Sequence, residues 1–563
     1  MRMRLYYYHD LSAHEQRNAA GADYTPAYLP VMLKNSGFSA QELTAEALLR
    51  YRPEEGDALL IGAEALTAAQ CQALAAAAED GCAVIAFAAK APGLFPDFVS
   101  EKQSGDDYDI VGYFHFSDTE ELLPVLGGFG SLPETGGEVL GWLKDREGGS
   151  HAALIRLRKG IWYWSFDLPA TLWHAADGRP TLELCNGFSK PRIPDGYVLG
   201  QEDNYAVPYA DSYMRAVEDL LVSRGFPRLY PLPVHNENVC DLALSFAGDD
   251  DATSEENDLA AAEAMFQRGL PYHLNLMPVD EEGRFRISRE QLEQLHAQGC
   301  ETALHYNFLM FPYSEEGYKL QSDMYEQAFG EVSIGPVNHC LIQVGTAGER
   351  YRIEAACGAL GDNNRLQAQM DPQDINAFNL SGFASGTAFP RFVLCDAAHG
   401  NRELDFCEVY SSFYEPRLYT EEPEECRKIE DYLEDGFAYG RPLQLFLHPH
   451  YISGVWCDPL PALKALDHAT DYVRKKGWNV WTCGPDALIH WWHDRAACQV
   501  ASLSSREFTV NNPTDWGITV VLPEDTQSVT VDNQPGALQT KTVAGKQCKL
   551  LNLGSGTFRV SCN

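Results

Sequence analysis

The chain has 563 residues, of which 45% are hydrophobic and 22% are charged. This composition is typical of globular proteins, and the length exceeds the roughly 250 to 300 residues that one hydrophobic core supports, so we expect two or three domains. The 80 acidic residues outnumber the 43 basic ones and leave a formal charge of -37. This charge disfavours nucleic acid, anionic lipid and highly anionic substrates as partners, whereas neutral or cationic sugars fit it better.

The N-terminus and the cysteines indicate the compartment. The opening residues, MRMRLYYYHDLSAHEQRN, lack the apolar stretch of about 7 to 15 residues that a secretory signal needs. The sequence also lacks the roughly 18 uninterrupted apolar residues of a transmembrane helix. The 15 scattered cysteines form no CxxC pair and are expected to be reduced. We therefore predict a cytoplasmic protein that does not contact membranes, with its oligomeric state left open.

Residues 1–200 alternate short apolar runs with amphipathic stretches. Runs such as ALLIG and AVIAF suit strands buried on both faces, which is typical of a parallel sheet covered by helices. We predict an open, flavodoxin-like α/β domain, and the segment resembles an amidotransferase-like domain. A working glutaminase places its cysteine on a tight strand-to-helix elbow, but Cys71 falls in an alanine-rich helix and Cys82 at a strand start. The domain is thus expected to be non-catalytic and to serve packing or substrate gating.

Two further segments flank the central region. Residues 201–235 predict a linker, with the amphipathic helix DSYMRAVEDLLVSRG followed by the proline-spaced connector FPRLYPLPVHNEN, where prolines stop helix and strand alike. Residues 497–563 contain short alternating segments rich in Thr, Val and Gly, which predict antiparallel strands. We expect these to form a small structural β-sandwich.

The strongest chemical signal is a run of three carboxylates. The predicted strand VCDLALSF leads through Ala-Gly into Asp249, Asp250 and Asp251, which repel one another unless something offsets their charge. A divalent metal is the usual answer, with one aspartate as its ligand and another as the general base. The alternative is an aspartate-rich turn that caps a helix beginning near Thr253.

The order of elements after the triplet adds a resemblance. An amphipathic helix is followed by RGLPYHLNLMP, by the helix SREQLEQLHAQG and by CETALHYNF. This order resembles the polysaccharide-deacetylase superfamily, the family-4 carbohydrate-esterase-like barrels, whose first strand ends in TFDDG and whose third ends in a metal-binding histidine motif. The resemblance covers about residues 1–495 and implies a distorted (β/α)7-type barrel over residues 236–496.

The resemblance also implies the ligands of a metal. Asp249 is assigned as the catalytic base, Asp250 and Asp251 as metal ligands, and His305 as the first histidine ligand, while the division of base and ligand among the three aspartates is left open. The second histidine of the family lies four residues further on, where this chain has Leu309.

Candidates for the missing ligand are Asn307 and His339. We assign His339 as a metal ligand because its segment, GPVNHCLIQVGTAGERYRIEAACGALGDNN, is similar to the NHC-type segment of a subgroup; the alternative is a core histidine at a strand end. Asn307 is assigned to substrate binding. The family carries an arginine that orients the base, and here Asn338 occupies that neighbourhood, so the orienting group is left open.

Near the end of the predicted barrel, the buried strand of PLQLFLHPHYISG ends in two histidines. His448 is assigned as the general acid, because a histidine with a pKa near about 6.5 can protonate a leaving amine at neutral pH. His450 is assigned to substrate binding, either as a neighbour of His448 or as a residue at the rim. The Gly- and aromatic-rich stretch from residue 379 to 416 is expected to form the wall of the cleft.

The implied activity is removal of an acetyl group from an N- or O-acetylated carbohydrate by a metal-dependent hydrolase. Zinc is expected first, because a mixed His/Asp site suits it, although cobalt or manganese fit nearly as well. The alternative is a catalytically altered protein of the same fold that binds sugars or hydrolyses another C–N bond, and the missing second histidine favours it.

Overall fold

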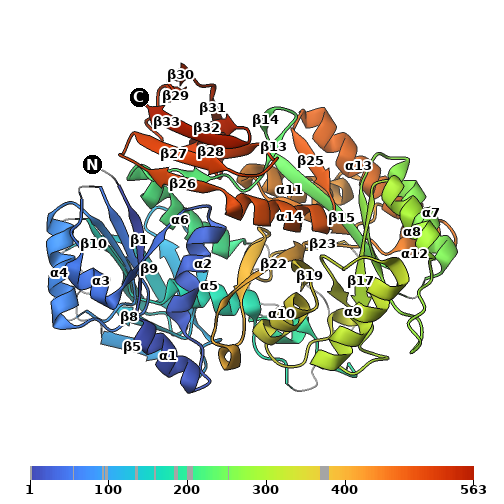
Figure 1. Cartoon of the computed structure of the whole chain (residues 1–563), viewed down its shortest axis with the longest axis horizontal. Helices are drawn as coiled ribbons and strands as arrows, with labels where there is room; N and C mark the ends of the chain where they lie inside the picture. The colour runs from blue at the N-terminus through green and yellow to red at the C-terminus, as the bar shows by residue number, and fades with distance from the viewer. Residues whose placement is uncertain are drawn as a thin grey trace.

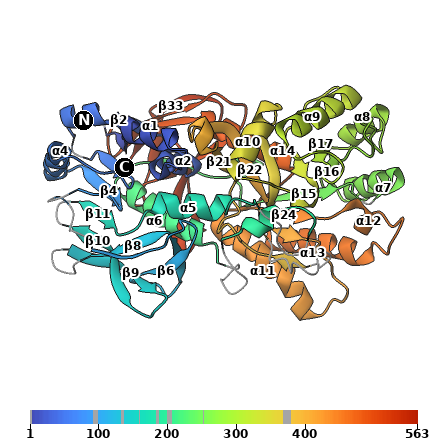
Figure 2. The ribbon, with the colours of Figure 1, turned by 90° about the horizontal axis from the view of Figure 1, so that it is seen from below.

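The computed structural model describes residues 3–54, 56–91, 94, 99–132, 137–157, 160–182, 188–198, 207–251, 253–367 and 379–563. It is a mixed α/β protein with several sheets. The N-terminal sheet and a curled sheet built around β15 (Leu242–Asp249) lie at opposite ends of the long axis, as Figures 1 and 2 show. Among the described helices, none has the length and apolar character needed to cross a membrane.

The N-terminal sheet has nine strands in the order β2-β1-β3-β4-β11-β10-β9-β6-β7. Five of them are parallel: β2 (Gln41–Thr44), β1 (Leu5–His9), β3 (Ala58–Ile61), β4 (Ala83–Phe87) and β11 (Ile161–Trp164). The other four extend the sheet in antiparallel fashion: β10 (Ser150–Leu157), β9 (Gly137–Asp145), β6 (Ile110–Phe116) and β7 (Leu123–Leu126). A separate pair is formed by β5 (Val99–Gln103) and β8 (Gly128–Ser131).

Helices cover both faces of the parallel part because successive strand residues point in opposite directions. Leu60 of β3 shares a core with α2 (Tyr28–Asn35) and α5 (Leu168–Asp177). Its neighbour Leu59 shares a different core with α3 (Ala45–Arg50) and α4 (Ala68–Glu79). The expected βα alternation therefore describes the first half of this region, and the antiparallel half was not predicted. The flavodoxin-like assignment stays a prediction.

In the curled sheet β15 is a central strand with neighbours on both sides, and its eight residues are all buried. On one side follow the parallel strands β16 (Tyr272–Leu276), β17 (Cys300–Tyr306) and β18 (Val337–Asn338). On the other side follow β24 (Pro442–Phe446), β23 (Phe413–Tyr414) and β20 (Leu380–Ser381), while β25 (Val480–Cys483) pairs with the first half of β15. A three-stranded sheet, β19 (Gly361–Leu366), β22 (Glu403–Ser411) and β21 (Arg391–Leu394), stands beside it.

The two sheets are joined at one edge by hydrogen bonds, one of which involves a side chain. The backbone N–H of Asn338 donates to Asn364 Oδ1 at 2.6 Å, and that of Asn363 donates to the carbonyl of Pro336 at 3.3 Å. The curl is completed by helices on the outside, namely α7 (Glu255–Phe266), α8 (Arg289–Ala297), α9 (Glu315–Phe329), α10 (Ala347–Ala356), α11 (Pro423–Tyr439), α13 (Leu460–Lys476) and α14 (Pro485–Ala497). A curled α/β sheet is thus present, whereas the complete seven-stranded barrel stays a prediction.

Two antiparallel sheets follow α14. One contains β26 (Gln499–Ser502), β27 (Glu507–Asn512), β33 (Gly556–Cys562), β29 (Val529–Val531) and β30 (Gln534–Pro535). The other contains β28 (Ile518–Leu522), β32 (Lys546–Leu553) and β31 (Leu538–Val543), and its fourth strand is β12 (Arg228–Leu229). The connector, expected to lack strands, contributes β12 to this sheet after α6 (Tyr209–Ser223) and also contains β13 (Val234–His235), which pairs with β14 (Asn238–Val239).

The regions share buried contacts. One apolar core includes side chains of the N-terminal sheet, α6, α14 and both C-terminal sheets. The domain limits stay predictions, and the predicted limit at residue 200 falls outside the described residues.

Buried charges also join the N-terminal region to β21 and β22. Arg391 Nη2 lies 2.5 Å from Asp177 at the end of α5 and 2.7 Å from Glu408 of β22. Glu408 also accepts from Arg350 at 3.1 Å and from the Tyr351 hydroxyl at 2.7 Å. Burial alone would raise the pKa of Glu408, but the surrounding arginines outweigh burial and lower that pKa to about 2.

Candidate metal centre

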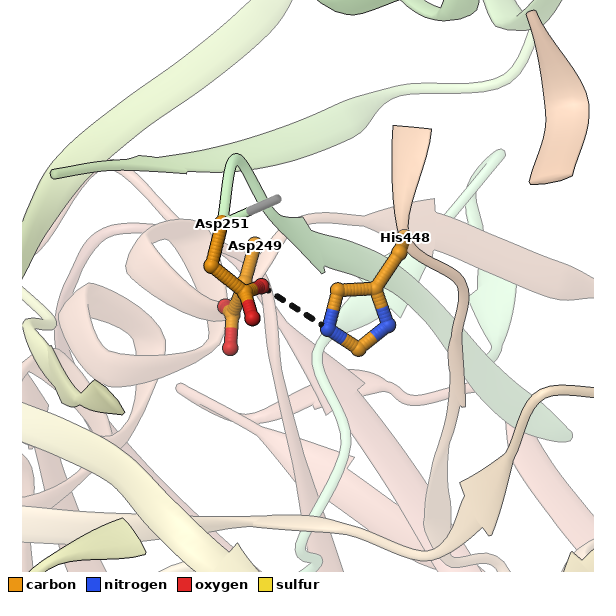
Figure 3. Close-up of side chains that lie close together, drawn as sticks. All are labelled: Asp249, Asp251 and His448. Carbon is orange, nitrogen blue, oxygen red and sulfur yellow. Dashed lines mark ion pairs between the residues drawn. The ribbon is translucent and has the colours of Figure 1, made fainter. Parts of the chain in front are cut away.

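The aspartate run divides at the end of β15. Asp249 is the last residue of the strand, and Asp250 and Asp251 follow it. The carboxylates of Asp249 and Asp251 lie beside the imidazole of His448, as Figure 3 shows, with one potential ligand atom of each of the three residues within 4.8 Å of the others. His448 Nε2 lies 3.1 Å from Asp251 Oδ1. The structure thus brings together the predicted base, one predicted ligand and the predicted acid.

Asp250 has different partners. Its side chain is fully buried, its Oδ1 accepts from the backbone N–H of Met277 at 2.9 Å, and its Oδ2 accepts from Arg286 at 3.1 Å. Burial raises the pKa of Asp250 to about 7, although Arg286 opposes the shift. Both oxygens are therefore occupied by protein donors, and Asp250 does not join the group formed by Asp249, Asp251 and His448.

His305 lies at the same end of the curled sheet, on β17. Its Nε2 is 3.4 Å from Asp249 Oδ2 and its Nδ1 is 3.9 Å from Asp250 Oδ1. The ring is fully buried, and neither nitrogen has a hydrogen-bond partner among the described residues. Burial lowers the pKa of His305 to about 4, so the imidazole is neutral at pH 7 and each nitrogen that carries no proton offers a lone pair.

His339 follows β18 in the short 3-10 turn His339–Leu341. Its Nε2 lies 3.2 Å from Asp251 Oδ2, and its ring centroid lies 5.1 Å from that of His305. The next two residues, Cys340 and Leu341, both adopt a φ of 55°, a left-handed conformation that costs free energy for side chains other than glycine. The turn therefore presents His339 to Asp251 at a cost in backbone strain.

His448 is held on both sides of its ring. Glu415, which follows β23 and is 1% exposed, lies 2.5 Å from Nδ1 and also accepts from the backbone N–H of His448 at 3.0 Å. Burial alone would lower the pKa of His448. The Asp251 carboxylate, the Tyr414 hydroxyl and the Glu415 carboxylate together outweigh burial and hold this pKa well above its ordinary value. The imidazole is thus protonated at neutral pH, which suits a proton donor.

Asp249 is oriented by residues in the interior of the sheet. Asn275 of β16 donates to Asp249 Oδ1 at 2.8 Å, and Asn275 Oδ1 lies 2.9 Å from His273 Nε2. His273 Nδ1 lies 3.1 Å from Glu301, which accepts from two backbone N–H groups at the start of α14. Asn338 is not the orienting group, because its amide donates to the Tyr318 hydroxyl and to the Ile342 carbonyl.

Glu415, Asn275 and His273 were not predicted from the sequence. The signal for the last two was available, because His273 and Asn275 alternate with apolar residues along β16, a strand that is buried throughout. Two buried polar side chains at this spacing share one face of a strand. Glu415 gave no such signal, since it follows a two-residue strand and reaches His448 across 33 positions of sequence.

A pocket of about 260 Å³ opens at this end of the sheet. Its lining includes Asp249, Asp251, His339, His448, His450, Tyr414, Phe446, Tyr451, Phe188 and Arg192. His450 lies against Tyr451, with ring centroids 3.9 Å apart and the ring planes tilted by 54°. Asn307, the other predicted substrate-binding residue, uses its amide on the backbone instead: it donates to the Pro278 carbonyl and accepts from the Met310 N–H, both at 3.3 Å.

The donor atoms fit a divalent metal. Among the described residues, both nitrogens of His305 and Nδ1 of His339 are buried without a hydrogen-bond partner. Buried polar atoms in this state cost free energy unless a ligand satisfies them. A mixed set of imidazoles and carboxylates suits Zn²⁺, and Co²⁺ and Mn²⁺ nearly as well.

Comparisons with known proteins give structural likenesses alone. Neither a protein-family model nor a curated protein matches the chain. A candidate polysaccharide deacetylase from Mycobacterium smegmatis is 13% identical over 47% of this chain and 94% of its own, with a TM-score of 0.31. A family 4 acetyl xylan esterase from Clostridium thermocellum, solved with a cobalt ion, is 10% identical over 44% of this chain and 91% of its own, with a TM-score of 0.24.

A family 4 pseudoenzyme from Bacillus anthracis is also similar, with 12% identity over 46% of this chain and 70% of its own and a TM-score of 0.25. The likenesses therefore include both deacetylases and a protein described as inactive. At TM-scores below 0.5 they carry no argument about fold or activity. The case for a function rests on the contacts of this chain's own residues.

Proposed function

We propose that this pocket binds a divalent metal ion and removes the acetyl group from an N- or O-acetylated carbohydrate. The observation that supports this proposal is the grouping of Asp249, Asp251 and His448 within 4.8 Å, next to a neutral buried His305 whose two nitrogens make no hydrogen bond to the described residues. Perturbed titratable groups that converge on one pocket are typical of catalytic sites.

Asp251, His305 and His339 would hold the metal, and we name zinc first. When bound, the metal would supply Lewis-acid chemistry, polarising the acetyl carbonyl and favouring deprotonation of water. Asp250 was also expected as a ligand, but its contacts with Met277 and Arg286 favour a supporting role in which it fixes the turn that carries Asp251.

Asp249 would act as the general base. Asn275 holds its Oδ1, and its Oδ2 remains available to take a proton from the attacking water. As the water oxygen bonds to the carbonyl carbon, the C–N or C–O bond to the sugar breaks. His448 would then give its Nε2 proton to the departing nitrogen or oxygen, while Glu415 keeps the ring in place through Nδ1.

The sugar would be bound by the aromatic side chains in the pocket wall. Tyr414, Phe446 and Tyr451 all line it, and aromatic rings offer apolar faces to the C–H groups of a sugar ring. His450, whose Nδ1 has no hydrogen-bond partner in the described part of the chain, is a candidate for a sugar hydroxyl.

A second candidate function is a protein of this fold that binds sugars without removing acetyl groups, or that hydrolyses another C–N bond. One observation favours it: Leu309 stands where the resemblance implies a second histidine ligand, and its side chain is 46% exposed. His339 would have to replace that ligand for metal-dependent catalysis.

The test is metal content measured beside acetate release. The purified protein, Asp251→Ala, His305→Ala and the control His399→Ala, which alters an exposed histidine paired with Asp396, would be compared on N- and O-acetylated sugars. We expect one metal per chain and acetate release in the wild type and the control, and loss of both in the other two variants. Metal without acetate release would favour the second candidate, and no metal would refute both the centre and its hydrolytic role.

A further inference from the structure

An arginine from the N-terminal region lines the pocket. Arg192 precedes the 3-10 turn η2 (Ile193–Gly196), and its side chain contributes to the same wall as Asp249, Asp251 and His448 although it lies more than 50 positions earlier in the sequence. The residue is 7% exposed. Arg192 is therefore a buried residue of the pocket lining rather than a residue of the outer surface.

The backbone around Arg192 is attached to the curled-sheet region. Arg192 forms a β-bridge with Ile342, and the Pro191 carbonyl accepts from the N–H of Gln343 at 3.1 Å. The Arg192 N–H itself donates to Asp195 Oδ2 at 2.9 Å. Ile342 is close in sequence to His339, so the same segment carries a candidate ligand and fixes the arginine. The position of Arg192 relative to the metal centre is thus set by the fold.

The guanidinium of Arg192 has no counter-ion in the described part of the chain. It forms no ion pair there, its Nε is buried without a hydrogen-bond partner, and its nearest aromatic neighbour is the Phe188 ring, 4.7 Å from the guanidinium carbon. Arg350 and Arg441, which are also buried, are paired with carboxylates, and the buried Arg495 donates to three backbone carbonyls instead. An unpaired buried charge is costly, so the exception needs an explanation.

We propose that Arg192 binds an oxyanion carried by the substrate, so that the preferred ligand is an acetylated sugar with one carboxylate, sulfate or phosphate substituent. This inference rests on the proposed function for the identity of the sugar. Guanidinium groups pair with such oxyanions through two parallel hydrogen bonds, which fix orientation as well as add affinity. The bound oxyanion would direct the acetyl group of the same sugar toward Asp249 and His448.

Arg192 makes the pocket more favourable to a singly charged ligand than the net charge of the chain suggests. A formal charge of -37 disfavours polyanions at long range, but screening limits that field to about 8 to 10 Å at ordinary ionic strength. Within the pocket, a singly charged substituent meets Arg192, which has no carboxylate partner among the described residues. A ligand with one negative charge, rather than a highly charged polymer, satisfies both conditions.

The experiment measures binding and hydrolysis separately. The probes are N-acetylglucosamine, its 6-sulfate, its 6-phosphate and the corresponding acetylated uronic acid, titrated calorimetrically into the zinc-loaded protein; the three acidic probes distinguish the sources of the oxyanion. The variants are Arg192→Gln, Arg192→Lys and the control Arg474→Gln, which removes an equal charge from an exposed site on α13.

We expect the wild type and Arg474→Gln to bind at least one acidic probe about tenfold to a hundredfold more tightly than the neutral sugar, because a charge-assisted pair is gained. Arg192→Gln should lose this preference and keep its affinity for the neutral sugar. Arg192→Lys should keep part of the preference, since it retains charge without the planar fork.

The outcomes separate the two proposals. If no probe releases acetate but the Arg192-dependent preference is present, hydrolysis fails and the oxyanion site stands. If acetate is released and the wild type shows no preference for any acidic probe, or Arg192→Gln retains the preference, the hydrolase stands and the role of Arg192 is refuted.

Discussion

Replacing Glu415 with glutamine tests the most constrained contact of the pocket. Glu415 Oε1 accepts hydrogen bonds from Nδ1 of His448 at 2.5 Å and from the backbone N–H of the same residue at 3.0 Å. Glutamine keeps the size of the side chain and can still accept the backbone hydrogen bond, but it loses the negative charge. The change therefore isolates the electrostatic contribution of Glu415 to the protonated imidazole.

The magnitude follows from the loss of one charge-assisted hydrogen bond. Such bonds contribute about 1.5 to 3 kcal/mol, and losing one that favours the protonated imidazole lowers the pKa of His448. Because that pKa is raised in the folded protein, protonated His448 contributes stability that is present below its ordinary pKa and lost as the pH rises through the folded value. In Glu415→Gln this loss moves to lower pH, and so does the alkaline limb of acetate release.

The assay is a nuclear magnetic resonance titration of the histidine ring protons in metal-free protein, with His448→Asn used to assign the signal. A parallel measurement of acetate release against pH, with zinc present, reports the same group in the loaded protein. An unchanged His448 titration in Glu415→Gln would refute the reasoning, because it would mean that Asp251 alone sustains the raised pKa.

Three further predictions concern other parts of the chain. Glu408→Gln should lower the free energy of unfolding by about 3 to 5 kcal/mol, because the buried Arg350 and Arg391 lose a shared partner. The control is Asp405→Asn on the same strand, where the side chain is 87% exposed and the change should have little effect. Urea unfolding of both variants would measure the difference. From its pKa of about 2, ionised Glu408 contributes about 3 kcal/mol to the free energy of unfolding. This contribution is present above the ordinary pKa of a glutamate and is lost as the pH falls through about 2. Acid unfolding of the wild type and the variant would check it. Asn275→Ala should slow acetate release about tenfold to a hundredfold with zinc content unchanged, because Asp249 loses the donor that orients it, whereas Asn511→Ala on β27 should not; equal losses in both variants would contradict this. Leu309→His should leave zinc affinity within about twofold of the wild type in competition with a chelating dye, because Leu309 is exposed outside the pocket wall, and a large gain in affinity would contradict the assignment of His339.

The features predicted from the sequence are those that depend on short stretches of neighbouring residues, such as an apolar run followed by polar side chains. The apolar run ending at Asp249 predicted a buried strand followed by carboxylates at its end, and the run ending at His448 predicted a second such strand. Because both strands are parallel and adjacent, their carboxyl ends meet, and Asp251 and His448 lie 3.1 Å apart as a consequence.

The features that sequence did not predict depend on contacts across long separations. Adjacent aspartates cannot be told apart by pattern, yet Arg286 and the Met277 backbone occupy Asp250 while Asp251 faces the histidines. Arg192 and Glu415 reach the pocket from other elements, and no local periodicity connects them to it. The antiparallel half of the N-terminal sheet was missed because its strands interrupt the expected βα alternation between β4 and β11.

The small strand β12 has a practical consequence for dissecting the molecule. Its two residues, Arg228 and Leu229, pair with β28 some 290 positions later, so the C-terminal sheet is assembled from both sides of the curled-sheet region. A protein truncated after residue 496 would lack β28, the pairing partner of β12. The apolar side chains of α6 and α14 that pack in one core with β28 would then be exposed to solvent. During synthesis the chain passes through the same incomplete form, in which residues 497–563 are absent. We therefore expect the region containing the pocket to reach its final stability only after these residues have been made.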